Sequence, residues 1–113
     1  PIKKEIEELT GINRKVEIPI IASYLKNKYL FQLTDSKIYY LEKEGNIKNI
    51  SLEEIVSANV DLKMRNDANN MFKGLKLTTK SNEVFSVEVE PGKPLYGIQN
   101  VILLISGLNK VKN

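Results

Sequence analysis

The sequence predicts a mainly β fold: a closed or nearly closed antiparallel barrel of seven strands, capped by a C-terminal α-helix and preceded by a short extra helix. Apolar and polar residues alternate over 56–64, which is the period of a half-buried strand. Only a few residues separate successive apolar runs, too few for the crossovers that parallel strands need. A long apolar helical pattern over 94–109 follows the last strand and is expected to cover the open end of the barrel.

The length of 113 residues favours one domain over 1–113, because a chain of this size buries a single core. Its expected parts are an N-terminal helix at 1–10, the barrel at 14–90 and the capping helix at 94–109. The first helix is predicted by Ile2, Ile6 and Leu9, which recur at helical spacing among charged residues before Gly11.

Seven apolar, often β-branched runs predict the strands of the barrel. They lie at 16–24, 29–34, 37–42, 47–50, 56–64, 71–79 and 85–89. Pro19 indicates an edge, a bulge or a strand start in the first of them. Polar residues between the runs predict turns, and 51–54 is expected to be a corner, with Ser51 able to cap a single helical turn.

In the last two strands, Leu75, Leu77, Phe85, Val87 and Val89 are expected to face inward. The capping helix is expected to begin near Pro94, because proline is tolerated in the first turn of a helix. Its inward face is predicted to carry Ile98, Val101, Ile102, Ile105 and Leu108, and Gly107 is placed to end it.

Composition excludes several classes of function. The sequence contains neither histidine nor cysteine, so the commonest general base, nucleophile and soft metal ligands are missing, and we expect no enzyme, no metal and no cofactor. The 17 basic and 14 acidic residues are interleaved and give a formal charge of +3, which argues against nucleic acid. The absence of cysteine, of a signal peptide and of a long apolar stretch favours the cytoplasm.

Two stretches resemble the bacterial pleckstrin-homology-like (PH-like) domains. Residues 29–40 are similar to the hairpin of that family that reads leucine-threonine-aspartate, then basic, then aliphatic. Residues 50–55 are similar to its step of isoleucine, proline, leucine, two acids and isoleucine, with Ser51 in place of the frequent proline. Lys37 stands where arginine is often found. The resemblance covers about 16–108 and implies a seven-stranded barrel followed by a helix; many relatives have no determined function, and some assemble into rings.

Two candidate surfaces follow. Lys26 and Lys28 in the first hairpin, with Arg14 and Lys15 before it, could bind an anionic ligand such as a phospholipid headgroup, as in PH domains that bind phosphoinositides. A pair of lysines in a turn is, however, more simply a solvated loop, and it lacks the arginine fork that grips phosphate.

The second surface is the uncharged capping helix, on which Leu103 and Leu104 are expected to lie away from the barrel and so to need a cover. The cover is expected to be the first helix, through Ile2, Ile6 and Leu9, or another protein chain. The leading expectation is therefore a protein-interaction or self-assembly module with a protein partner or a homo-oligomer, and the alternative is a domain that binds membrane lipid.

Overall fold

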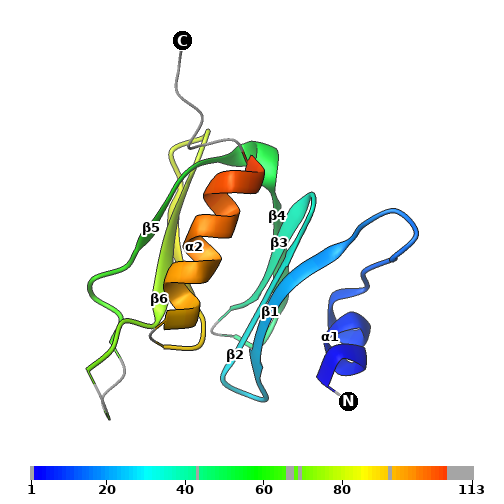
Figure 1. Ribbon diagram of the computed structural model, residues 1–113, viewed down its shortest axis with the longest axis horizontal. Coiled ribbons are helices and arrows are strands. Elements are labelled where there is room, and N and C mark those ends of the chain that lie inside the picture. The colour runs from blue at the N-terminus through cyan, green and yellow to red at the C-terminus, as the bar shows by residue number, and fades with distance from the viewer. Residues whose placement is uncertain (1, 43, 66–67, 69, 92, 107–113) are drawn as a thin grey trace.

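The computed structural model describes residues 2–42, 44–65, 68, 70–91 and 93–106 (Figure 1). The chain is mainly β, with a helix at each end of the described part. In chain order the elements are α1 (Ile2–Thr10), β1 (Pro19–Leu25), β2 (Tyr29–Thr34), β3 (Lys37–Leu41), β4 (Ile47–Ser51), the 3-10 turn η1 (Leu52–Glu54), β5 (Ile55–Val60), β6 (Gly74–Thr79), β7 (Val84–Glu88) and α2 (Lys93–Ser106). Seven strands followed by a helix is the order that the sequence predicts.

The strands form two antiparallel sheets. The first sheet has the order β1-β2-β3-β4, and the second has the order β5-β6-β7. Among the described residues no ladder joins β4 to β5 or β1 to β7, so the seven strands form two sheets, and of the closed or nearly closed barrel that was expected the closed form is not found. The chain changes sheets at η1, where Ser51 Oγ accepts a hydrogen bond from the Glu53 backbone N–H (3.3 Å). Near the end of β7, the Glu90 N–H donates to Ser23 Oγ of β1 (2.9 Å), which ties the two sheets together.

The core lies between the sheets and is closed on one side by α2. It contains buried side chains from both sheets, from η1 and from α2: Phe31, Leu33, Ile38, Leu52, Ile55, Ala58, Leu75, Leu77, Val87, Val89, Leu95, Ile98 and Ile102. Helix α2 packs on β5 and β6. Gln99 Nε2 also donates to the Ala58 carbonyl (2.9 Å), so the helix satisfies a polar group of β5, an outer strand of its sheet.

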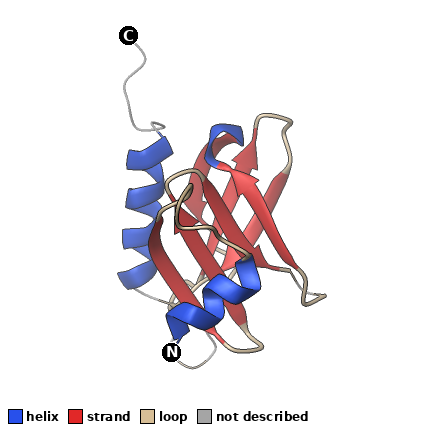
Figure 2. Ribbon diagram, turned by 90° about the vertical axis from the view of Figure 1, so that its right-hand side faces the viewer, coloured by secondary structure: helices blue, strands red, loops and turns tan. Residues whose placement is uncertain are grey.

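Helix α1 covers the other face of the first sheet (Figure 2). Along β2, Leu30 alternates with the core residues Phe31 and Leu33, and both Leu30 and Ile6 of α1 are 2% exposed. Tyr24 of β1 donates a hydrogen bond to Glu5 Oε2 of α1 (2.5 Å). The prediction that α1 covers α2 is therefore wrong, because the first sheet lies between them (Figure 1).

At three ends the strands are shorter by three or more residues than the apolar runs predict. β1 begins at Pro19 and β6 begins at Gly74, each three residues later than expected. β5 ends at Val60, because Asp61 Oδ1 accepts the Lys63 N–H (2.9 Å) and turns the chain. A register shift between Ile55 and Ser57 leaves Val56 45% exposed, although the alternation predicts it to be inward. The predicted end of the capping helix at 107–109 lies outside the described residues.

Candidate binding groove

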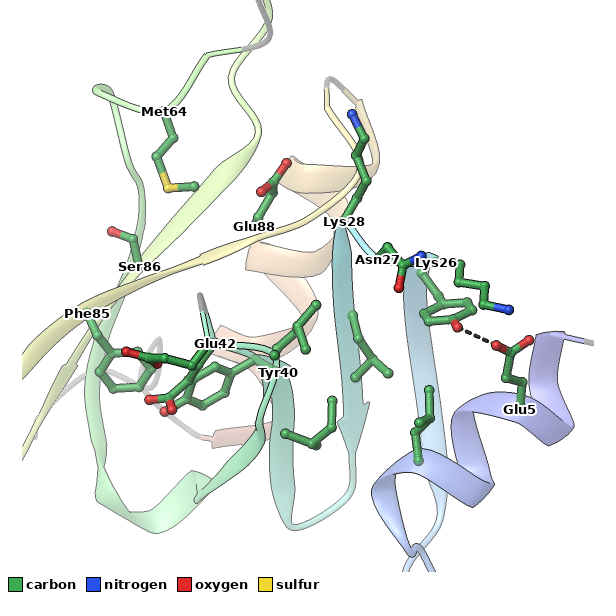
Figure 3. Close-up of a pocket in the computed structure, with 17 residues that line it drawn as sticks. Glu5, Lys26, Asn27, Lys28, Tyr40, Glu42, Met64, Phe85, Ser86 and Glu88 are labelled. Carbon is green, nitrogen blue, oxygen red and sulfur yellow. Dashed lines mark hydrogen bonds between the residues drawn. The ribbon is translucent and has the colours of Figure 1, made fainter.

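A hollow of about 710 Å³ lies where the β1–β2 and β3–β4 turns meet α1 and β7 (Figure 3). We call it the turn pocket. The sharp β1–β2 turn is made by Asn27, whose φ of 65° is a left-handed conformation that asparagine tolerates. Much of the lining is apolar or aromatic: Leu9, Tyr24, Leu30, Tyr40, Leu41, Ile47, Met64 and Phe85.

A second hollow, of about 560 Å³, continues from the first between β4 and β7. We call it the edge pocket, because β4 and β7 are outer strands of the two sheets. The two pockets share Tyr40, Glu42 and Phe85, and together they form one groove. The rings of Tyr40 and Phe85 stack with centroids 5.1 Å apart and planes at 26°, and both residues are half-buried. This aromatic pair, drawn in Figure 3, lines both pockets and is therefore the floor where they join.

Carboxylates outnumber lysines along the groove. The turn pocket is lined by Lys26 and Lys28 and by four glutamates: Glu5, Glu42, Glu44 and Glu88. Two of these are already engaged, since Glu5 accepts from Tyr24 and Glu88 lies 3.5 Å from Lys73 Nζ. The lining of the edge pocket has a single sign of charge. Its ionisable side chains besides Tyr40 are Glu42, Glu54 and Glu83, and among the described residues no lysine or arginine lines it.

The tyrosines of the groove respond to these carboxylates. Burial, and then the charges of Glu42 and Glu83, raise the pKa of Tyr40 above its ordinary value. At Tyr24 the hydrogen bond to Glu5 is the largest cause of a raised pKa. Both phenols are neutral at pH 7, so the formal charge of the groove comes from its glutamates and lysines, and the glutamates are in excess.

A buried polar cluster lies outside the groove, beneath the segment that joins α1 to β1. Glu17 is 7% exposed, and its two carboxylate oxygens accept hydrogen bonds from Thr34 Oγ1 (2.6 Å) and from Tyr39 OH (2.8 Å). Burial, and then the hydrogen bond to Glu17, raise the pKa of Tyr39 to about 12. Both donors belong to the first sheet, so the cluster fastens the connecting segment to that sheet.

The four basic residues expected to bind an anion do not form one site. Lys26 and Lys28 line the turn pocket, whereas Arg14 pairs with Glu7 and Lys15 is exposed elsewhere. No group of three or more carboxylates close enough to hold a metal ion is found within the described ranges.

The leucines and isoleucines that were expected to form one interaction surface also lie at different places in the structure. Leu104 is 67% exposed on α2, but Leu103 packs against the core, so its predicted outward position is wrong. On α1, Ile6 is buried against the first sheet and Leu9 lines the turn pocket. The Ile2 side chain lies outside the described residues. The structure thus brings Leu9, from one predicted surface, together with Lys26 and Lys28 from the other.

Sequence reasoning did not find the aromatic pair or the carboxylates beside it. Alternation placed Phe85 inward, which is confirmed by its packing against the core. Tyr40 and Phe85 are 45 positions apart, and no local pattern indicates that the end of β3 meets the start of β7. Glu42 and Glu83 both belong to turns, where charged residues are ordinary.

Comparisons with protein-family models, with curated proteins and with solved structures found no match. In the part of the chain that the structure describes, neither helix has the length and apolar character needed to cross a membrane. The groove itself is therefore the basis for a functional proposal.

Proposed function

We propose that this chain is a non-catalytic PH-like domain that acts as a protein-interaction module and binds its partner in the groove formed by the turn pocket and the edge pocket. The observation that carries the proposal is the groove: two joined hollows with an aromatic floor, flanked by the outer strands of both sheets. A protein segment fits such a surface, because interfaces combine an apolar and aromatic centre with a polar rim.

The PH-like part of the proposal is supported by the order of the elements. Four antiparallel strands are followed by three more and then by a helix that packs on the second sheet. This order agrees with the resemblance of 29–40 and 50–55 to bacterial PH-like sequences. The cytoplasm remains the expected location for a domain of this composition.

Lipid binding is the second candidate, and it is favoured by the position of Lys26 and Lys28 on the turn pocket. Glu42 and Glu44 line the same pocket, however, and carboxylates repel a phosphate group. Two lysines contribute about 1 kcal/mol each at a membrane surface, which is weak without further anchoring. The charges of the groove therefore favour a protein partner.

Self-assembly is a further form of the proposal, with a second copy as the partner. Tyr96 and Leu104 are 46% and 67% exposed on α2, and between them the described helix carries no charge. Sedimentation velocity over a range of concentrations tests this form, because an assembling chain gains mass as concentration rises.

A matched pair of variants tests whether the groove is the binding surface. Short peptides would be selected from a random display library on the immobilised full chain, and their affinities would then be measured by fluorescence anisotropy. Leu9→Asn changes an exposed leucine that lines the groove, and Leu104→Asn changes an exposed leucine on α2. We expect Leu9→Asn to weaken binding about tenfold, the value of one buried leucine, and Leu104→Asn to leave it unchanged.

If only Leu104→Asn weakened peptide binding, the interaction surface would instead be assigned to α2. A library that yields no peptide whose binding depends on Leu9 would contradict the proposal.

A further inference from the structure

We propose that the groove recognises a basic protein segment, and that a lysine or arginine side chain of this segment sits against Tyr40 and Phe85. The inference rests on the proposed function and names the chemistry of the partner. It is carried by charge complementarity between the carboxylates around the aromatic pair and a cation in the partner.

The aromatic pair provides a surface for a flat or compact cation. Tyr40 comes from the end of β3 and Phe85 from the start of β7, and both rings line both pockets (Figure 3). A ring face attracts a guanidinium or ammonium group, and the attraction is worth about 0.5 to 2 kcal/mol depending on desolvation. Both residues are half-buried, pack against the core and line the groove, so part of the pair is accessible to a ligand.

Three carboxylates border this floor, and among the described residues no lysine or arginine lines the edge pocket beside them. Glu42 borders both pockets, and Glu54 and Glu83 border the edge pocket from η1 and from the β6–β7 turn. Within the described residues no lysine or arginine forms an ion pair with any of the three. Lys48 is the cross-strand neighbour of Tyr40, but it is exposed and lines neither pocket.

The raised pKa of Tyr40 agrees with this charge distribution, since two of its causes are the neighbouring Glu42 and Glu83. The same negative charge that disfavours a phenolate favours an incoming cation. The turn pocket adjoins this aromatic floor and also offers apolar side chains, among them Leu41 and Ile47. A segment that places an aliphatic residue near a basic one would therefore satisfy both parts of the groove.

Two triple variants distinguish the effect of the charges in the groove from the effect of the net charge of the protein. The groove variant carries Glu42→Gln, Glu54→Gln and Glu83→Gln. The control variant carries Glu8→Gln, Glu53→Gln and Glu90→Gln, three exposed glutamates that line neither pocket. Both variants lose three negative charges and keep the shape of the side chains. The probes are peptides selected on the full wild-type chain, and each is also made with its arginine replaced by citrulline or its lysine acetylated.

We expect the selected peptides to be enriched in basic residues. The affinity of these peptides should be at least about tenfold lower for the groove variant than for the wild type, and it should fall by as much when the basic side chain of the peptide is neutralised. The control variant should lower the affinity by less than about twofold. Circular dichroism of both variants checks that they are folded.

Peptides without basic residues, or an equal loss on both triple variants, would overturn the basic-segment inference. The proposed function would survive that result if the same peptides still lose affinity with Leu9→Asn. Phosphoinositide vesicles that bind the groove variant more tightly than the wild type, while no peptide is selected, would overturn both and assign the site to lipid.

Discussion

Helix α2 closes one side of the two-sheet core, whereas the side between β4 and β7 is closed by the stacked rings of Tyr40 and Phe85. The α2 side is dry, and Ile98 and Ile102 are 2% and 0% exposed. The β4–β7 side is half-buried and bordered by carboxylates. The difference agrees with the proposed function, in which the dry α2 side stabilises the core and the half-buried β4–β7 side remains accessible to a partner.

The largest expected effect is on the α2 side. Ile102→Ala removes buried methyl groups from the core and should lower the free energy of unfolding by about 2 to 5 kcal/mol, measured by urea denaturation. Leu104→Ala, on the exposed face of the same helix, should change it by less than about 0.5 kcal/mol. Equal losses at the two positions would mean that the outer face of α2 is also covered.

Tyr39 offers a pH-dependent test of the polar cluster that Glu17 forms with Thr34 and Tyr39 on the first sheet. Its pKa of about 12 in the folded chain exceeds the ordinary 10.0, so the folded state holds the phenolic proton more tightly. The resulting stability, of about 2 to 3 kcal/mol, is fully present below pH 10 and is lost as pH rises to about 12.

Tyr39→Phe isolates this contribution. The variant should be less stable at pH 7 by about 1 to 3 kcal/mol, because the buried Glu17 loses a hydrogen-bond donor. The difference between variant and wild type should then narrow from pH 10 to pH 12, since only the wild type can ionise at this position. A constant difference over that range would show that Tyr39 is not held protonated.

Alanine substitutions at two glycines test whether the turn-pocket side and the α2 side of the molecule each tolerate an added methyl group. A Cβ at Gly74 would lie 2.9 Å from Met64 Cβ, next to the turn pocket, so Gly74→Ala should cost about 1 to 3 kcal/mol. Gly97 lies in α2 with no heavy atom within 4 Å of an added Cβ, so Gly97→Ala should stabilise the chain by about 0.5 to 1 kcal/mol. Thermal unfolding of both variants gives the sign, and a stabilising Gly74→Ala would show that Met64 can move aside.

The smallest expected effect concerns the first hairpin. Changing both Lys26 and Lys28 to Glu should alter stability by less than about 0.5 kcal/mol, because both are exposed. We also expect no saturable binding of the wild type to phosphoinositide vesicles at physiological salt, measured by co-sedimentation. Saturable binding that the double variant abolishes would instead make Lys26 and Lys28 the site.

The sequence predicts the elements of the fold better than the closure of the fold. Alternation and helical spacing are local signals, and they correctly place seven strands, two helices and inward residues such as Leu75 and Leu77. Whether the sheets close into a barrel depends on contacts between distant strands, which no local signal records. Val56 was misplaced for a related reason, since the bulge beside it becomes visible only once β5 is paired with β6.

The sequence predicts some residues of the candidate site but assigns them to two separate surfaces. Leu9 and Lys28 were both singled out, but for two different surfaces, and the fold brings them to one pocket. The first helix was one of two covers expected for α2, and it does not cover α2 because Leu30 gives the first sheet an apolar patch on its outer face, where Ile6 is buried instead. Amphipathic spacing indicates that a helix has an apolar face to bury, but it does not indicate which part of the protein that face packs against.

Amide chemical-shift mapping tests the central claim most directly. The full chain, labelled with ¹⁵N, would be titrated with a selected peptide that carries arginine, and the shifts would be followed residue by residue. We expect the largest changes at 40–42 and 83–85, around the aromatic pair, and small changes along α2. Changes concentrated at Tyr96 and Leu104, or confined to Lys26 and Lys28, would contradict it.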